Sequence, residues 1–405
     1  MQFHARLLLL NVLLAALLSG WCGNNNSVSK TIAPPQPTPA ASTAPPRPPV
    51  LSGDEVTFYP TYGYKDANGW NINLRGWVHK DRPGVNRLLG GFRECSKEEM
   101  SNFKSRTADL LDDSQPNEEV VVKFNSDPDN KPYTLSKSKA DGIVELKLVL
   151  SDDKAKQLQG SSNGWLTYHT VSDGHTGVGR VRLIEPGSGE SLISDIDDTI
   201  KVTEIPAGNA TVLKNTFCHP FKAVPEPEIL KLYKDIGDNP VHYVSGGPER
   251  LFGPLYDYLI VDGGGFPEGT FHLRFLPRPD SFEAMSTLIN SVKSPLDETY
   301  KHKVHEITIL MERFPERRFI LVGDSGEVDP EVYNEIRKRR PAQIKEIIIR
   351  DVARDEPLNH FRLAGMTIIP VNPPVCVEAK HFKHLSDKMK EIYPTQTYQP
   401  VPCGP

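Results

Sequence analysis

The sequence has little of three things: cysteine, long apolar runs and net positive charge. It holds 5 cysteines in 405 residues and no CxxC pair, which argues against a cysteine-based zinc site. The 47 basic and 52 acidic residues give a formal net charge of -5, which argues against a protein whose main role is to bind nucleic acid. The hydrophobic content of 38% is enough for real cores, and the length suggests two folded units.

The first 22 residues are expected to be a signal peptide. Basic residues precede an apolar run, Leu7–Leu18, and small residues follow it. The run is shorter than the roughly 20 residues that cross a bilayer, although an uncleaved anchor is the alternative. Residues 23–52 form a Pro/Ala/Thr-rich tether, which stays extended and buries no core. These segments predict a protein that is secreted or tethered to a membrane outside the cytosol.

Export makes cysteine pairing relevant, because disulfides persist in oxidising compartments. Cys22 lies near the expected cleavage region. The other cysteines are even in number and compatible with two disulfides: Cys95, Cys218, Cys376 and Cys403. The alternative interpretation is that they are small buried hydrophobic residues.

Residues 53–188 are predicted to form a mostly antiparallel β-sandwich or barrel. In the stretch GIVELKLVL, apolar residues from Val144 to Leu150 alternate with charged ones, as in a strand with one buried face. Further strands are expected at 56–64, 70–79, 120–124, 165–171 and 178–184. A single helix is expected at 96–112, where Ser96 and Glu99 have the spacing of a capping box. No chemistry in this region outranks a structural role.

Residues 189–375 are predicted to form an α/β domain with a parallel sheet, followed by a C-terminal tail at 376–405. Short apolar runs at 192–193, 241–244, 319–322 and 347–349 alternate with expected helices at 226–236, 297–314 and 329–340. Continuous apolar strands that alternate with helices indicate a parallel sheet covered on both faces. In such sheets ligands bind beyond the carboxyl ends of the strands, so polar residues there are the candidates for a site.

Four elements in this region together predict a phosphate site. The first is a DxDxT sequence, Asp195 to Thr199, directly after an apolar run. The second is Ser245-Gly246-Gly247 after the next run, and the third is Lys303 near the start of a helix. The fourth is a GDxxxxD sequence that holds Asp324 and Asp329. Alone, each has an ordinary interpretation as a turn, a cap or a surface lysine, but their order is much more specific.

This order resembles that of the haloacid-dehalogenase-like phosphatases. The strings SDIDDTIKVTE, VSGGPERLF, HKVHEI and FILVGDSGEVDPEVY are similar to the Mg²⁺-dependent phosphatidate phosphatases of the fungal actin-patch-associated type, over about 189–355. The upstream string DEVTFYPTYGYKDANGWNINLRGWVH is similar to the amino-terminal β region of that family. The resemblance implies a haloacid-dehalogenase-like, Rossmann-type catalytic domain, and it does not extend to the signal peptide and tether.

The chemistry follows from the residue types. Asp195 is the candidate nucleophile, because a carboxylate is ionised at pH 7 and can attack phosphorus to form an acyl-phosphate. Asp197 is the candidate general acid and base, with a pKa that neighbouring carboxylates are expected to raise. Thr199 is expected to hold the loop by hydrogen bonding. Ser245, Gly246 and Lys303 are expected to bind the phosphoryl oxygens, since a phosphomonoester dianion needs its charge neutralised.

The acidic residues also predict a metal site. Carboxylates at 195, 197 and 324 cannot all stay ionised beside a phosphate without a cation, and oxygen ligands favour Mg²⁺. Asp195 and Asp324 would supply side-chain oxygens, and the resemblance implies a main-chain carbonyl of Asp197 as a further ligand. Asp329 is expected to ligate the ion or orient its water, a task that Glu327 could share.

The predicted substrate is phosphatidate, which would be hydrolysed to diacylglycerol and phosphate; the enzyme class comes from the four elements and the lipid from the resemblance. Another phosphomonoester, or a non-catalytic surface-binding role, is the alternative. A flap at 202–225 could meet acyl chains through Phe217, Phe221 and Val224, which could equally be core. Arg274 or Arg278 is a candidate for substrate contact. The basic run 337–340 would touch a membrane surface or end a helix favourably.

Overall fold

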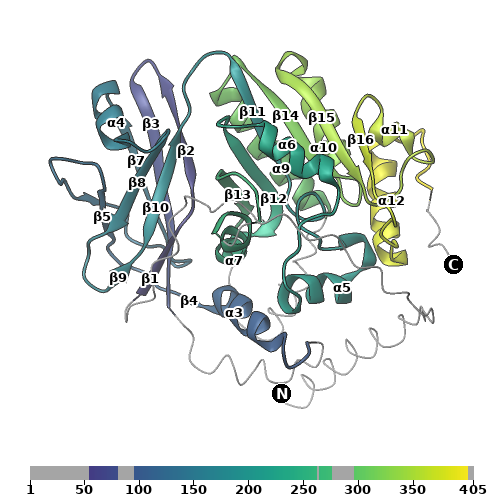
Figure 1. The fold of residues 1–405 in the computed structure, drawn as a ribbon, viewed down its shortest axis with the longest axis horizontal. Coiled ribbons are helices and arrows are strands. Elements are labelled where there is room, and N and C mark those ends of the chain that lie inside the picture. The colour runs from purple at the N-terminus through teal and green to yellow at the C-terminus, as the bar shows by residue number, and fades with distance from the viewer. Residues whose placement is uncertain (1–53, 81–94, 262–263, 276–295, 400–405) are drawn as a thin grey trace. The chain divides into compact units, whose positions relative to one another are not determined.

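The computed structural model describes residues 54–80, 95–261, 264–275 and 296–399 (Figure 1). The predicted signal peptide (1–22) and tether (23–52), as well as Arg278 and Cys403, lie outside these residues. Among the residues that are described, no helix combines the length and apolar character needed to cross a membrane.

The first sheet is mostly antiparallel and has ten strands, as the alternation of apolar and polar residues predicts. Its order is β6-β5-β8-β10-β2-β3-β1-β9, with β4 and β7 also paired to β3. The strands are β1 (Asp54–Phe58), β2 (Thr61–Asp66), β3 (Gly69–Lys80), β4 (Asp113–Ser114), β5 (Val121–Phe124), β6 (Tyr133–Thr134), β7 (Ile143–Leu150), β8 (Trp165–Thr170), β9 (His175–Thr176) and β10 (Val178–Leu183). Two pairs, β1 with β9 and β2 with β10, are parallel. The segment predicted as one strand at 56–64 is divided into β1 and β2.

This sheet bends so that strands distant in its order share one core. The ring centroids of Phe58 on β1 and Tyr168 on β8 lie 4.9 Å apart, although these strands are not hydrogen-bonded neighbours. Residues at alternate positions of β3, such as Ile72 and Leu74, are buried in the same core. Period-two patterning therefore places one face of each strand inside.

The prediction of a single helix in this region is wrong, because the structure has two. Helix α3 (Met100–Leu111) lies within the predicted range 96–112, and the Ser96 and Glu99 side chains accept hydrogen bonds from each other's backbone amides. Helix α4 (Asp152–Gln159) was missed, although its N-cap is readable in the sequence. Ser151 Oγ accepts a hydrogen bond from the Lys154 amide, and two aspartates follow in the first turn, where the helix dipole favours them.

The second sheet is entirely parallel, with the order β13-β12-β11-β14-β15-β16. Its strands are β11 (Gly189–Ser194), β12 (Val241–Pro248), β13 (Thr270–Arg274), β14 (Arg317–Asp324), β15 (Ile344–Asp351) and β16 (Thr367–Pro370). Numbered by their order in the chain, the strands run 3-2-1-4-5-6 across the sheet, which is the Rossmann arrangement. The first three strands are added toward one edge and the last three toward the other, so the order switches between β11 and β14. A site is expected beyond the carboxyl ends of those two strands.

Helices cover both faces of the parallel sheet (Figure 1). The described helices of this region are α5 (Asn209–Leu213), α6 (Pro227–Asp235), α7 (Phe252–Tyr256), α9 (Leu296–Arg313), α10 (Asp329–Arg339), α11 (His360–Leu363) and α12 (Ala379–Ile392). On β14, Ile320 and Val322 are buried in one core cluster while Phe319 and Leu321 are buried in the other. The continuous apolar run of this strand is thus explained by burial on both faces.

The C-terminal segment 376–399 contributes to this structure. Leu385 and Met389 of α12 are buried in the same core cluster as Ile307 of α9. Spacing of four residues places both apolar side chains on one face of the helix. The segment is therefore packed through one face of a helix.

The expectation of disulfides is supported by Cys95 and Cys218, whose sulfurs are bonded to each other. This bond joins the segment before α3 to the segment between α5 and α6. Cys376 is also disulfide-bonded. Both cysteines of the first bond are enclosed, so their small size suits burial as well as cross-linking.

Candidate active site

Asp195 lies where the geometry of the sheet places it, directly after β11 at the switch in strand order. Its backbone amide donates to the carbonyl of Val322 on β14, which fixes the start of the loop. Only 1% of the residue is exposed, and Thr199 Oγ1 donates to Asp195 Oδ2 across 3.2 Å. Thr199 therefore holds the Asp195 carboxylate itself, a more direct role than the predicted loop hydrogen bond.

Lys303 brings a positive charge to this carboxylate from the opposite side. It is on α9, and its Nζ lies 2.8 Å from Asp195 Oδ1 and 2.5 Å from Asp329 Oδ1. All three side chains are at most 1% exposed, so water screens these contacts little. The lysine is thus in contact with two of the predicted acidic residues.

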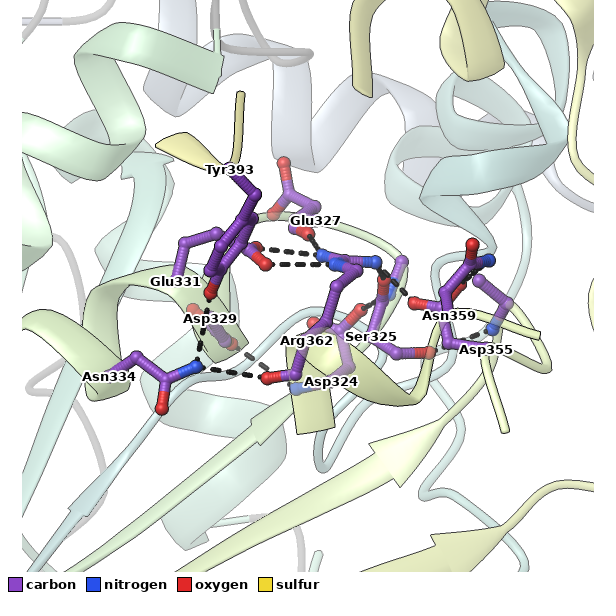
Figure 2. Close-up of polar contacts among 12 residues, drawn as sticks. Asp324, Ser325, Glu327, Asp329, Glu331, Asn334, Asp355, Asn359, Arg362 and Tyr393 are labelled. Atoms are coloured by element: carbon purple, nitrogen blue, oxygen red, sulfur yellow. Dashed lines mark hydrogen bonds and ion pairs between the residues drawn. The ribbon is translucent and has the colours of Figure 1, made fainter. Parts of the chain in front are cut away.

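The end of β14 and the start of α10 supply the two acids of the GDxxxxD sequence, Asp324 and Asp329. Asp329 Oδ2 accepts a hydrogen bond from the Asp324 amide, and Asp324 Oδ1 accepts one from the Gly326 amide across 2.6 Å (Figure 2). A methyl group on Gly323 would lie 2.4 Å from Asp329 Oδ2, so a side chain there would displace the carboxylate. Glycine before Asp324 is therefore required by the close approach of Asp329.

Three of the predicted metal residues converge. Oxygens of Asp195, Asp324 and Asp329 all lie within 4.8 Å of one another. Asp324 Oδ2 is buried and has no hydrogen-bond partner, an arrangement that is costly unless a cation binds there. An oxygen-only set with an unpartnered carboxylate oxygen fits a hard divalent ion.

Burial and mutual repulsion make these acids unusual. Burial raises the pKa of Asp195 well above its ordinary value; Lys303 opposes this effect and Asp329 adds to it. Burial, followed by the charges of Asp329 and Asp195, raises the pKa of Asp324 in the same way. Burial also raises the pKa of Glu327 to about 7, with Lys303 acting in the opposite direction. These raised pKa values indicate that the site is buried and crowded with carboxylates whose negative charge is not fully balanced without a cation.

The expected direction for Asp197 is wrong. Burial acts most strongly and would raise its pKa, but the ammonium group of Lys201, the hydrogen bond from Thr203 and the charge of Lys303 together lower the pKa. Lys201 Nζ lies 2.6 Å from Asp197 Oδ1, and Thr203 Oγ1 donates to the same oxygen across 2.5 Å. The expectation of a raised pKa considered only the neighbouring carboxylates and left out Lys201, four residues further along the chain.

Ser245, Gly246 and Gly247 lie at the carboxyl end of β12, beside the loop of Asp197. A methyl group added to Gly247 would lie 3.3 Å from Ser245 Oγ and 3.8 Å from Asp197 Oδ2. Gly246 packs closely against Thr299 on α9, one turn before Lys303. The structure thus brings the serine loop next to Asp197 and the lysine-bearing helix.

Arg362 is a residue that the sequence analysis missed. It is fully buried and donates to the main-chain carbonyls of Ser325 and Glu327, which belong to the Asp324–Asp329 loop (Figure 2). It also contacts both Glu331 oxygens, at 2.9 and 2.8 Å, and the carboxylate of Asp355. A lone arginine in a short helix gives no sequence signal, because its partners are distant in the chain.

The loop that follows Asp197 is held by Asp198. Its backbone has φ +55°, in the left-handed region, and its carboxylate accepts hydrogen bonds from the amides of Thr203, Glu204 and Ile205. Arg350 on β15 donates to the Asp198 carbonyl across 2.7 Å. Asx-type hydrogen bonding is a signal that the DxDDT sequence could have offered.

The residues proposed for substrate selection are mostly structural. Phe217 and Val224 are buried in the core, so the core interpretation is the one that the structure supports for them. Phe221 is partly buried, with the Arg106 guanidinium 3.6 Å from its ring centroid. Arg274 lies at the end of β13, and its Nη1 is buried without a hydrogen-bond partner.

The basic run at 337–340 ends α10, as the helix interpretation predicts. Arg337 donates to the carbonyls of Ala364 and Gly365, while Arg339 and Arg340 contact glutamates. These three arginines are therefore engaged within the protein.

A second acidic group lies on the antiparallel sheet, where oxygens or nitrogens of Asp54, Glu118 and His175 come within 4.8 Å of one another. All three residues are partly exposed, and Lys80 Nζ lies 3.6 Å from Asp54. The buried group around Asp195 is the better candidate for a metal centre, because its acids lack such access to water.

Comparisons with known proteins agree with this location. Residues 190–351 match the family described as "Phosphatidate phosphatase APP1, catalytic domain". The chain is 34% identical over 165 residues to "Phosphatidate phosphatase APP1" of Saccharomyces cerevisiae and 26% identical over 176 residues to an uncharacterized protein of Schizosaccharomyces pombe. These alignments cover 40% and 42% of this chain, and the chain spans only 26% of the length of each relative.

A solved structure reported as "The active site of a carbohydrate esterase displays divergent catalytic and non-catalytic binding functions" covers 73% of this chain and 87% of its own, at 12% identity. Its TM-score of 0.19 carries no structural argument. The family match instead coincides with the segment from β11 to β15 that holds every buried acid of the site. Residues 190–351 are therefore similar to the catalytic domain of the APP1-type phosphatidate phosphatases.

Proposed function

We propose that this protein is a Mg²⁺-dependent phosphatase that hydrolyses phosphatidate to diacylglycerol and phosphate through an aspartyl-phosphate intermediate. The observation that carries the proposal is the buried cluster of Asp195, Lys303, Asp324 and Asp329 at the switch point of a parallel sheet. The family match and the named yeast relative support the reaction class and the lipid.

Asp195 is the nucleophile. Lys303 holds Oδ1 and Thr199 holds Oδ2, so the carboxylate is oriented before a substrate arrives. Attack of a carboxylate oxygen on phosphorus forms the P–O bond of the aspartyl-phosphate and breaks the bond to the leaving alkoxide. Lys303 offsets the charge that accumulates on the phosphoryl oxygens.

Asp197 moves the protons. In its protonated form it gives a proton to the departing alkoxide of diacylglycerol. In its ionised form, which Lys201 and Thr203 stabilise, it removes a proton from water. The resulting attack on phosphorus breaks the bond to Asp195 and releases phosphate, with Asp197 protonated again. Ser245 and the Gly246 backbone, which precede the Gly247 that lies close to Asp197, contact the phosphoryl oxygens.

A divalent ion would be held by Asp195, Asp324 and Asp329, together with the Asp197 carbonyl, and Glu327 would orient a water ligand. When bound, it would neutralise negative charge on the phosphate and the acids. The site holds five carboxylates, at 195, 197, 324, 327 and 329. Among the described lysines, two have ammonium groups in contact with these carboxylates, Lys201 and Lys303. This imbalance, with the unpartnered Asp324 oxygen, supports the proposal of a bound cation.

A haloacid-dehalogenase-like fold is proposed for the domain that contains this site. The Rossmann strand order and the position of Asp195 after the central strand support it. Residues 53–188 and 189–375 are proposed as two domains, with the sheet of β1–β10 in the first and that of β11–β16 in the second. Secretion or tethering outside the cytosol is also proposed, and the Cys95–Cys218 bond supports it.

A second candidate is a phosphatase for another phosphomonoester. The burial of Phe217 and Val224 favours it, because these flap residues are not available for acyl chains. Both candidates share the same catalytic chemistry and differ only in what surrounds the phosphate.

Phosphate release by the full chain distinguishes these proposals. The substrates are phosphatidate in detergent micelles, glycerol 3-phosphate and a phosphoserine peptide, each with Mg²⁺ or with EDTA. We expect Mg²⁺-dependent release with preference for phosphatidate. Equal rates on all three would refute the lipid assignment, and no release from any of them would refute the phosphatase assignment.

A further inference from the structure

Two of the strings that resemble the phosphatidate phosphatases contain residues that the catalytic chemistry does not use. In VSGGPERLF these are Glu249 and Arg250, which follow the serine loop. In the upstream string they are Arg75 and Trp77, which lie on β3 of the antiparallel sheet. The structure brings these four residues into contact, and they are called the clamp below.

The first half of the clamp is a two-point ion pair. Arg75 Nη1 donates to Glu249 Oε2 across 2.8 Å, and Nη2 donates to Oε1 across 3.2 Å. Glu249 is only 6% exposed. Parallel hydrogen bonds of this kind restrict orientation as well as distance, which a single contact does not.

The second half fixes the next residue. Arg250 is buried, its guanidinium carbon lies 4.2 Å from the Trp77 ring centroid, and Nη2 donates to Ser114 Oγ across 2.8 Å. Nη1 donates to the Asp112 carbonyl across 3.1 Å. Trp77 Nε1 donates to the same Ser114 oxygen, so strand, arginine and serine form one connected network.

The clamp is adjacent to the phosphate-binding loop. Ser245, Gly246 and Gly247 form an irregular stretch near the end of β12, which finishes at Pro248, and Glu249 begins the turn that follows. Two successive glycines carry no side chains that would restrict the loop, so its conformation depends on how its ends are held. Pairing with β13 holds Val244 and Pro248 on either side of the segment, and the clamp fixes the two residues that follow Pro248.

We infer that Arg75 and Trp77 of the antiparallel sheet position the Ser245–Gly247 loop for phosphoryl binding by holding Glu249 and Arg250. These are positioning residues, since they contact none of the acids of the site. The inference deepens the proposed function, on which its kinetic consequence rests. The antiparallel sheet thereby takes part in catalysis through two buried contacts.

Arg75→Met tests the inference, because it removes the ion pair and leaves a side chain of similar length. We expect kcat/KM for phosphate release to fall about tenfold to a hundredfold, the range for displacement of a binding group by about 1 Å. The loss should include a higher KM, because the displaced loop binds the phosphoryl group. Arg318→Met, which removes an exposed ion pair with Glu190, is the matched control and should behave as the parental protein.

Two further measurements separate positioning from general loss of structure. The exchanged pair Arg75→Glu with Glu249→Arg should recover a substantial part of the kcat/KM that either single change loses. Amide hydrogen exchange of residues 241–252 should accelerate in Arg75→Met while exchange in α10 stays parental. An unchanged exchange pattern in 241–252, or lower kcat at parental KM without recovery in the exchanged pair, would overturn the inference.

The failure of the proposed function is distinguishable from the failure of this inference. A parental chain that releases no phosphate from any ester would refute the former. The hydrogen-exchange comparison would still decide whether the clamp orders the loop, since it needs no activity.

Discussion

The two sheets of this protein differ in how they balance buried charge. In the antiparallel region, the buried carboxylate of Asp127 forms an ion pair with Lys154. At the carboxyl edge of the parallel sheet, Asp195 and Asp329 share the single ammonium group of Lys303, and Asp324 forms no ion pair with another described residue. Balanced pairs are typical of structural roles, whereas an excess of buried negative charge is typical of a site that binds a cation.

The largest effect is expected for replacement of Asp195, and it is compared with replacement of Asp127, because both aspartates are buried and contact a lysine. Asp195→Asn should lower phosphate release by roughly 10³-fold or more, because an amide cannot attack phosphorus or form the acyl-phosphate. Asp127→Asn is the control, since its side chain is equally enclosed and contacts Lys154. It should keep the parental kcat. Equal loss in both variants, measured with correctly folded protein, would break the distinction between the two sheets.

The next effect is on stability. Arg362→Met should lower the free energy of unfolding by roughly 3–5 kcal/mol, because Glu331 and Asp355 would be left buried without a cation. Urea unfolding monitored by circular dichroism measures it. Loss of the hydrogen bonds to the Ser325 and Glu327 carbonyls should also weaken Mg²⁺ binding. A variant as stable as the parental protein would contradict the assigned role of Arg362.

The charge imbalance predicts a pH dependence. In the unfolded chain Glu327 ionises near its ordinary pKa of 4.5, but in the folded protein its pKa is raised to about 7. Between these values the folded state holds the extra proton, so the stability of the metal-free protein falls as pH rises. Glu327→Gln should remove this loss, which gives a gain of about 3 kcal/mol at pH 8 and almost none at pH 4.

The antiparallel sheet should show the opposite sign. Burial acts to raise the pKa of Asp127, but the hydrogen bond and charge of Lys154, together with backbone hydrogen bonds from Asp129 and Lys131, lower the pKa. Its contribution to stability is present above its ordinary pKa and is lost on acidification. Asp127→Asn should therefore destabilise the protein at neutral pH and have little effect at low pH. Unfolding of Glu327→Gln and Asp127→Asn in EDTA, measured across this pH range, tests the difference in sign. If the stability changes of the two variants had the same dependence on pH, the comparison would be refuted.

The smallest effect is expected at the surface. Lys65 Nζ lies 2.7 Å from Asp152 Oδ1, but the two side chains are 32% and 64% exposed. Lys65→Met should change the free energy of unfolding by less than about 1 kcal/mol, because water and salt screen such a pair. A larger loss, seen in the same urea unfolding assay, would show that ion pairs at the edge of this sheet are coupled more strongly than their exposure suggests.

Much of the fold could be predicted because its signals are local. The alternation in β7 and the continuous apolar runs of β11 and β14 reflect how many faces of each strand are buried. The short strand β13 and helix α12 were not predicted, since β13 has mixed polar content and α12 follows several prolines. Their positions depend on the sheet edge and on the core that they cover.

The residues of the candidate site could be predicted from the sequence, but the direction of their pKa shifts was harder to predict. Strand ends in a parallel sheet meet at one edge, so Asp195, Ser245 and Asp324 could be grouped from the sequence. The pKa direction of Asp197 could not, because it depends on the rotamer that carries the Lys201 ammonium to within 2.6 Å. Spacing along the chain does not determine where a flexible side chain ends.

The sequence by itself determined the change from antiparallel to parallel sheet and the acids that follow the strands, because burial patterns and turns act over a few neighbouring residues. Only the tertiary structure decided that Arg362 holds the Asp324–Asp329 loop, that Arg75 and Trp77 hold the turn after Ser245, and that Cys95 pairs with Cys218. These contacts join segments far apart in the chain. Their energies arise from desolvation and geometry, which exist only once the chain is packed.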